Sequence, residues 1–271
     1  MGRIFTYGCS FTSYLWPTWA DLLLYKNDGY NLANIGAGAI QTMHRIVDTD
    51  ASFGFNENDL AIAIFPNLYR WDYVFSSESK WSNDGLILNK NEFHELNNNF
   101  FTLESLAHNN MNAMVLAKNF LTNNKVNNLF GCIENIFENT FNEFPAEHFS
   151  RIDYVRKNIN FDLKSFNRFI YGDRLTTKWE TTKIFTENVD YHPRPITHYK
   201  WLKEILLPKL NDYELKITEE EVMEMERKID GFGSVKDCYT YFEKKTDYFE
   251  KRISSKVYFE MNQSPRKFKL I

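Results

Sequence analysis

The stretch Tyr7-Gly8-Cys9-Ser10-Phe11-Thr12 organises the rest of the chain. A β-prone run, residues 3–7, leads into it and ends at the glycine. A helix is predicted soon after it, because Trp16, Trp19 and Leu23 recur at helical spacing. A serine between a first strand and a helix lies where open α/β sheets bind ligands, and N–H groups near a helix start favour negative charge. Taken alone, the six residues fit a capping turn as well as they fit a nucleophile.

Alternating strands and helices predict the fold class. The second strand runs from about residue 30 into a glycine-containing turn at residues 34–38. Residues 60–65 form a continuous apolar run, which is typical of a strand covered on both faces, and the run ends at Pro66-Asn67. A further strand is predicted at residues 126–133, and the helices are predicted around residues 40–47, 103–121 and 196–206. We therefore expect a three-layer α/β/α sandwich with a mostly parallel sheet.

Two units are predicted along the chain, a main domain over residues 1–210 and a helical extension over residues 211–271. Residues 68–101 are rich in aromatic side chains without periodicity and are expected to form an irregular insertion, whereas residues 134–188 carry no motif. Thr218-x-x-Glu221 resembles a capping box, and the stripe Val222, Met225, Ile229 continues from it as a helix up to residues 231–233. A second helix is predicted from 234 to 253, with Cys238, Phe242, Phe249 and Ile253 on one face. This extension is expected to pack on the outside and to contribute no catalytic group.

Composition excludes several classes of function. The chain has 271 residues and is 43% hydrophobic, which is enough to form a sizeable core. Its formal charge of -4 gives no overall basic field that would attract nucleic acid. Its apolar runs fall short of the roughly 20 residues that cross a bilayer, and a strand begins too early for a signal peptide. The three cysteines, Cys9, Cys132 and Cys238, are widely separated, which is typical of a reducing compartment. We expect a cytoplasmic protein without membrane or nucleic-acid partners.

Metal and cofactor motifs are missing from the sequence. It contains no Cys-x-x-Cys or His-x-x-x-His pair, and Gly36-x-Gly38 lacks the third glycine of a dinucleotide-binding loop. We therefore expect neither a metal nor a cofactor. Cys9 is expected to pack away from Ser10, and His198 is expected to be structural.

Three turns and a histidine form a candidate site. Ser10, Gly36 and Asn67 follow the first three predicted strands, whose carboxyl ends share one edge of a parallel sheet, while His192 lies near the end of the main domain with Asp190 before it. Acyl transfer needs a nucleophile, a base, an orienting acid and donors for the oxyanion, and this set contains each of them.

The order of these residues resembles the SGNH (GDSL-type) hydrolase superfamily over roughly residues 3 to 210. Gly8-Cys9-Ser10-Phe11-Thr12 resembles a variant first block in which Cys replaces the Asp of GDS, and Asn31-Leu32-Ala33-x-x-Gly36 resembles the second block. Asn67 stands where the third block has its asparagine, and Asp190-x-His192-Pro193 resembles the fifth block. The resemblance implies a flavodoxin-like sandwich without a cofactor.

The resemblance also implies a role for each residue. Ser10 would be the nucleophile, His192 the general base and Asp190 the group that orients the imidazole, while the Ser10 N–H, the Gly36 N–H and the Asn67 amide would form the oxyanion hole. Two departures stand out. The family's fifth block usually has an Asp three residues before the His, whereas Asp190 lies two residues before His192. The stretch around Asn67 lacks the third block's usual Gly-x-Asn-Asp.

The expected function is therefore serine-dependent hydrolysis of a small-molecule or glycan ester. Trp71, Tyr73 and Trp81 of the insertion could stack on a sugar, which suggests a carbohydrate O-acetyl ester, or could equally fill a satellite core. Two alternatives stay open from the sequence. One is an acyltransferase on the same fold, and the other is a non-catalytic binding or assembly module that retains the fold.

Overall fold

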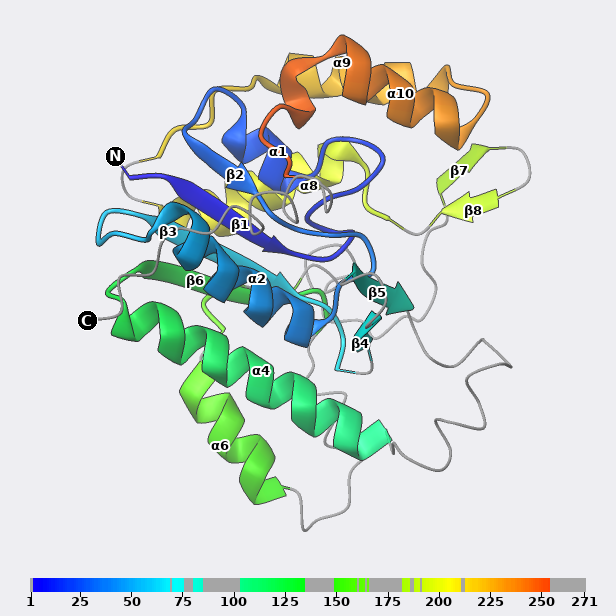
Figure 1. The fold of residues 1–271 in the computed structure, drawn as a ribbon. Coiled ribbons are helices and arrows are strands. Elements are labelled where there is room, and N and C mark those ends of the chain that lie inside the picture. Colours follow the sequence, from blue (N-terminus) through cyan, green and yellow to red (C-terminus); the bar gives the residue numbers. More distant parts are fainter. Residues whose placement is uncertain are drawn as a thin grey trace.

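A four-stranded parallel sheet of order β2-β1-β3-β6 forms the centre of the computed structural model (Figure 1). The strands are β1 (Ile4–Gly8), β2 (Gly29–Asn31), β3 (Leu60–Phe65) and β6 (Asn127–Cys132). Gly8 pairs with Ile64, and Phe65 pairs with Cys132, so the carboxyl ends of these strands share one edge. The predicted α/β sandwich is confirmed. The structure describes residues 2–68, 70–75, 80–84, 103–134, 149–159, 161–163, 165, 182–185, 188–190, 192–210 and 213–253.

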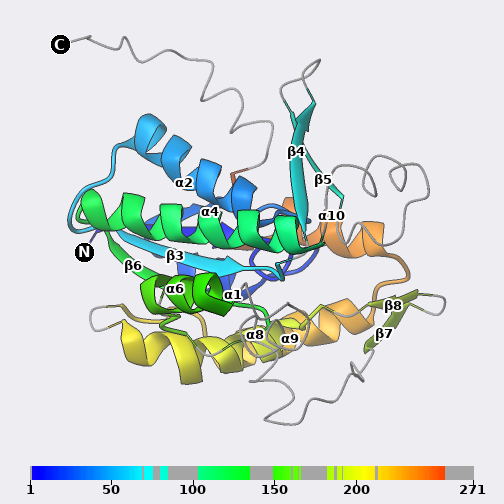
Figure 2. The same cartoon turned by 90° about the horizontal axis from the view of Figure 1, so that it is seen from below.

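Side chains of the central strands alternate between two cores, because successive residues of a strand point to opposite faces. Phe5 and Tyr7 belong to the core beneath α2 (Ala39–Phe53), α4 (Leu103–Asn123) and α6 (Phe149–Ile159). Ile4 and Ile62 belong to the core beneath α1 (Trp19–Leu24) and α8 (Pro195–Trp201). The sheet lies between a layer of α2, α4 and α6 and a layer of α1 and α8 (Figure 1), and the view from below looks onto the first of these layers (Figure 2).

The predicted helices at residues 103–121 and 196–206 are present. Leu106, Met114 and Leu121 of α4 are buried, as predicted. The second of these helices is less regular, because α8 continues as a π-helical turn, η3 (Leu202–Leu206), and a 3₁₀ turn, η4 (Leu207–Lys209). None of the helices that the structure describes is long and apolar enough to cross a membrane.

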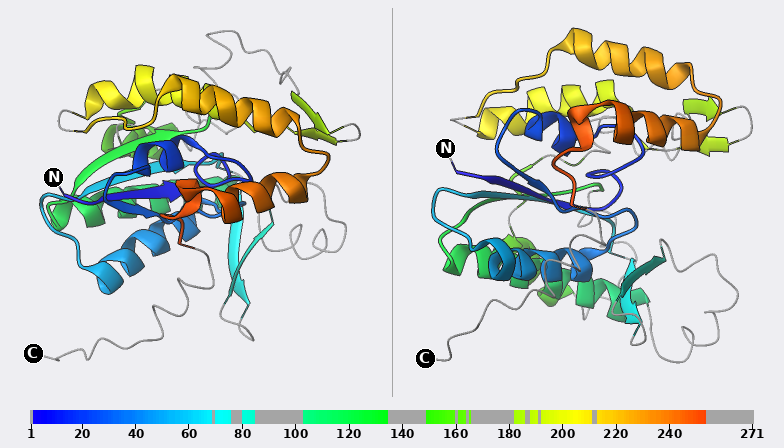
Figure 3. Two further views of the ribbon diagram at one scale, coloured as in Figure 1. Left: turned by 90° about the horizontal axis from the view of Figure 1, so that it is seen from above. Right: turned by 45° about the horizontal axis from the view of Figure 1, so that its top comes forward.

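The first part of the carboxyl-terminal extension forms the helices α9 (Glu219–Asp230) and α10 (Val235–Lys245), which lie outside α8 and α1 (Figure 3). The capping box of α9 is confirmed, since the Thr218 N–H donates to Glu221 Oε2 at 2.7 Å and the Glu221 N–H donates to Thr218 Oγ1 at 3.2 Å. Val222, Met225 and Ile229 are buried in the same core as α1 and α8. The extension therefore shares the core of the main domain.

The second predicted helix of the extension ends earlier than its periodicity indicates. Thr246 has extended backbone, and its Oγ1 donates to the Phe242 carbonyl at 2.7 Å, which ends α10 at Lys245. A 3₁₀ turn, η5 (Asp247–Phe249), follows, and the chain then runs parallel to β2. Ile253 consequently lies in the core on the other face of the sheet, so the prediction that it shares a face with Phe242 is wrong.

The insertion after β3 contains regular structure that its composition did not predict. β4 (Trp71–Phe75) and β5 (Lys80–Asp84) pair antiparallel, and Tyr73 lies opposite Ser82. The expectation of an irregular segment is therefore wrong for these residues. Residues 85–101 lie outside the described part of the chain, as do the side chains of Trp71, Tyr73 and Trp81, so their stacking role stays a prediction.

Two methionines of α9 test whether the extension is part of the core. Met225 is 3% exposed, whereas Met223 on the same helix is 44% exposed. We expect Met225→Ala to lower the free energy of unfolding by about 2–5 kcal/mol, because a buried cavity results. Met223→Ala, the matched control, should change it by less than about 0.5 kcal/mol. Urea unfolding measures both, and equal values for the two variants would contradict a shared core.

Candidate functional site

Gly8, the last residue of β1, sets the path of the chain into the serine turn. Its φ of +147° is rarely adopted by residues with a side chain, and a Cβ would lie 2.5 Å from Thr12 Oγ1 and 2.5 Å from a carbonyl of β3. The Cys9 carbonyl then accepts a hydrogen bond from the Thr12 N–H at 2.9 Å. This turn holds Ser10 at the carboxyl edge of the sheet, next to a completely buried Cys9.

Ser10 and His192 meet at this edge. Ser10 Oγ lies 2.8 Å from His192 Nε2, although 182 positions separate the two residues. Ser10 is 4% exposed and His192 is half-buried. With the imidazole proton on Nδ1, Nε2 accepts the hydroxyl hydrogen of Ser10, which is the arrangement that a general base requires. The structure thus brings together the predicted nucleophile and the predicted base.

Aromatic side chains from the loop before α1 hold the histidine segment. The Tyr14 ring stacks on the His192 ring with centroids 3.7 Å apart and planes 17° apart. Trp16 Nε1 donates to the Pro193 carbonyl at 2.8 Å, and the Tyr14 and Trp16 rings meet edge to face. The spacing in the sequence did not predict this role, because Trp16 fits the helical stripe with Trp19, whereas α1 begins only at Trp19.

The two other predicted turns lie beside the serine turn. The Asn34 N–H donates to the Gly8 carbonyl at 3.1 Å, which fixes the second turn against the first, and Gly36 has a φ of +83°. Within the described residues, neither the Ser10 N–H nor the Gly36 N–H donates to another backbone group. Asn67 follows the end of β3 at the same edge. The oxyanion-hole roles of these three residues stay predictions.

Asp190 is the last residue of β8 (Asn188–Asp190), which pairs antiparallel with β7 (Thr182–Phe185). Its backbone lies opposite Thr182. The Asp190 side chain is outside what the structure describes, so its role in orienting His192 stays a prediction.

Asp72 of β4 supports the second turn and was not found from the sequence. Its carboxylate accepts the Gly38 N–H at 2.7 Å and the Gln41 N–H at 2.8 Å, at the amino end of α2. Burial raises the pKa of Asp72, while the hydrogen bonds from these N–H groups oppose the rise. A Cβ on Gly38 would lie 2.5 Å from Asp72 Oδ2, so a glycine at this position is what lets the carboxylate come so close to the backbone. No local spacing in the sequence links positions 38 and 72.

Asp21 of α1 supports the serine turn in a similar way. It is 2% exposed, and it accepts hydrogen bonds from the Thr18 N–H at 2.8 Å and from Asn31 Nδ2 at 3.0 Å. The same Asn31 amide and the Thr18 hydroxyl both donate to the Thr12 carbonyl, at 2.8 and 2.6 Å. The end of the serine turn is therefore fixed to both β2 and the start of α1.

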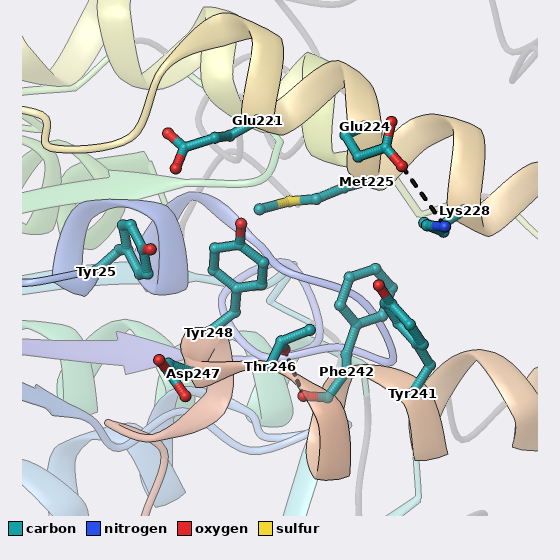
Figure 4. Close-up of a pocket in the computed structure, with 10 residues that line it drawn as sticks. All are labelled: Tyr25, Glu221, Glu224, Met225, Lys228, Tyr241, Phe242, Thr246, Asp247 and Tyr248. Atoms are coloured by element: carbon teal, nitrogen blue, oxygen red, sulfur yellow. Dashed lines mark hydrogen bonds and ion pairs between the residues drawn. The ribbon is translucent and has the colours of Figure 1, made fainter.

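A hollow of about 250 Å³ lies between α9 and the end of α10 (Figure 4). Three tyrosines and several charged side chains line it, among them Tyr25, Tyr241, Tyr248, Glu221 and Lys228. It contains none of the predicted site residues. Within the described residues, no three His, Cys, Asp or Glu side chains gather closely enough to hold a metal ion.

Comparisons with known proteins do not assign the chain to a family. No protein-family model matches the chain, and no curated protein matches it. A function for this chain is therefore inferred from the residues of the site itself.

His198 is a second histidine near the site, completely buried in α8. Burial, and after it the charge of His192, lower the pKa of His198 to about 3, while a hydrogen bond with the Pro193 backbone opposes the shift. The ring is therefore neutral when the protein is folded at neutral pH.

The lowered pKa of His198 makes stability depend on pH. Unfolding restores a pKa near 6.5, so below that pH the unfolded chain binds a proton that the folded chain excludes. The free energy of unfolding should therefore fall as the pH drops from about 6.5 toward 3, at roughly 1.4 kcal/mol per pH unit for this one proton. Replacing the residue, His198→Gln, should make this slope shallower by that amount in urea unfolding. Identical slopes for wild type and variant would contradict the assignment.

Proposed function

We propose that the chain is a serine-dependent ester hydrolase of the SGNH type. The observation that carries the proposal is the 2.8 Å contact between Ser10 Oγ and His192 Nε2 at the carboxyl edge of a parallel sheet. Ligands bind at this edge in open α/β folds, and a serine paired with an imidazole is the activated nucleophile of acyl transfer. The order of the serine, glycine, asparagine and histidine turns in the sequence supports the same class.

In the proposed reaction, Ser10 Oγ attacks the carbonyl carbon of the ester while His192 Nε2 takes the hydroxyl proton. Negative charge then develops on the carbonyl oxygen, where the N–H groups of Ser10 and Gly36 and the amide of Asn67 would donate hydrogen bonds. His192 returns the proton to the leaving alcohol oxygen, which leaves an acyl group on Ser10. A water molecule, deprotonated by His192, releases the acid and restores the serine. Asp190 would stabilise the imidazolium that forms twice in the cycle.

Rigid surroundings favour the use of Ser10 and His192 as nucleophile and base. Stacking on Tyr14 fixes the plane of the imidazole, and the hydrogen bond from Trp16 to Pro193 fixes the backbone next to it. The turn that carries Ser10 is fixed through Thr12. Holding the nucleophile and the base in a reactive geometry removes part of the entropic barrier to the reaction. We propose small-molecule or glycan esters as the substrates.

Hydrolysis of 4-nitrophenyl acetate tests the proposal. We expect Ser10→Ala to abolish turnover above the uncatalysed background, because no acyl group can then be attached to the chain. We expect His192→Gln to lower kcat by about 10²–10⁴-fold, the usual contribution of a general base. A fluorophosphonate probe should label wild-type protein at Ser10 and leave Ser10→Ala unlabelled.

Ser13→Ala is the matched control, because Ser13 lies in the same turn as Ser10. Its contact there is a hydrogen bond from its backbone N–H to the Cys9 carbonyl, which the substitution keeps. It should keep wild-type kcat and wild-type labelling. Turnover that survives in Ser10→Ala at the wild-type rate would show that Ser10 is not the nucleophile, and absence of turnover and labelling in the wild type would favour a non-catalytic module.

A further inference from the structure

The extension reaches the serine site through residues 251–253, which lie just beyond η5. The Lys251 carbonyl accepts the Asn31 N–H at 2.8 Å, and the Ile253 N–H donates to the Asn31 carbonyl at 2.9 Å, so residues 251–253 run along the open edge of β2. Between them, the Arg252 guanidinium lies over the Phe249 ring, 3.4 Å from its centroid. Backbone pairing and ring contact together fix where this side chain points.

The Arg252 guanidinium binds Asp21 and two backbone carbonyls. Nε donates to Asp21 Oδ1 at 2.8 Å and Nη2 to Asp21 Oδ2 at 2.5 Å, which is a bidentate ion pair. Nη1 donates to the Tyr14 carbonyl at 2.5 Å, and Nη2 donates to the Trp16 carbonyl at 3.1 Å. The Arg252 side chain is 14% exposed and that of Asp21 is 1% exposed, so water competes little for these bonds.

The two carbonyls belong to the two residues whose side chains hold the histidine segment. Tyr14 stacks on His192, and Trp16 donates to the Pro193 carbonyl. Arg252 thus fixes the backbone of Tyr14 and Trp16, while their rings fix His192. A planar guanidinium reaches all these acceptors at once, whereas a lysine ammonium acts as a point charge and cannot.

We propose that Arg252 is a positioning residue for His192, acting through Tyr14 and Trp16, and that the carboxyl-terminal extension in this way completes the site. The inference rests on the proposed function for its effect on turnover. Its structural part, the orientation of the His192 ring, can be measured without any substrate.

Arg3 offers a matched control at the opposite end of the same sheet. Its Nε donates to Asp59 Oδ1 at 3.1 Å and its Nη2 to Asp59 Oδ2 at 2.6 Å. Like Arg252, it also binds two backbone carbonyls, those of Phe53 and Gly54. The two arginines therefore make the same set of bonds, but Arg3 precedes β1, at the edge away from Ser10.

The experiment compares Arg252→Lys with Arg3→Lys at a temperature where circular dichroism shows both variants folded. For Arg252→Lys we expect kcat on 4-nitrophenyl acetate to fall by about 10- to 100-fold with little change in KM, because the base is displaced while the binding surface remains. In protein labelled with ¹³C-histidine, the His192 Cε1–H signal, assigned through His192→Gln, should lose the shift caused by the Tyr14 ring. The Arg3→Lys variant should keep both wild-type values even if its stability falls equally.

An unchanged kcat and His192 signal in Arg252→Lys would overturn the proposal, and so would an equal loss of both in Arg3→Lys. If Arg252→Lys does not fold, Asp21→Asn takes its place, because it keeps the shape of the side chain and removes the charge that holds the guanidinium. The His192 signal then decides alone, because Asp21 also supports the serine turn and a fall in kcat would have two causes. A wild type that folds but hydrolyses no ester would overturn the proposed function alone, and the His192 signal would still decide whether Arg252 positions the ring.

Discussion

The buried carboxylate of Asp21 is the constraint on which the serine edge of this structure depends. Burying a charge is unfavourable unless hydrogen bonds and an opposite charge replace the lost water. Asp21 obtains both from separate parts of the chain, namely the cap of α1 at Thr18, the end of β2 at Asn31 and the extension at Arg252. Satisfying this one group therefore brings together the start of α1, the edge of the sheet and the carboxyl-terminal extension.

The geometry of the candidate site follows from this arrangement. Ser10 comes from a turn whose end is fixed at the Thr12 carbonyl, and His192 comes from a segment held by the rings of Tyr14 and Trp16. The loop between β1 and α1 thus carries the serine on one side and holds the histidine on the other. A site of this kind needs little movement to align Ser10 with His192, which is what the proposed catalysis by preorganised groups requires.

The extension has more than one physical role. Val222, Met225 and Ile229 close the core over α8, and without them this apolar surface would face water. Residues 251–253 also cover the edge of β2, whose backbone groups would otherwise be open to pairing with another chain. A segment that looks like a charged helical appendage in the sequence is therefore part of both the core and the sheet edge.

The sequence by itself determined the features that depend on near neighbours in the chain. The apolar run of β3, the periodicity of α4 and the capping box of α9 were all predicted, because strand alternation, helical spacing and capping act within a few residues. The order of the turns also singled out Ser10 and His192 as partners. Only the tertiary structure decided that Asp72 supports Gly38 and that Arg252 reaches Tyr14. These contacts depend on which buried carboxylates and open strand edges remain to be satisfied once the elements have packed, and no spacing along the chain records that.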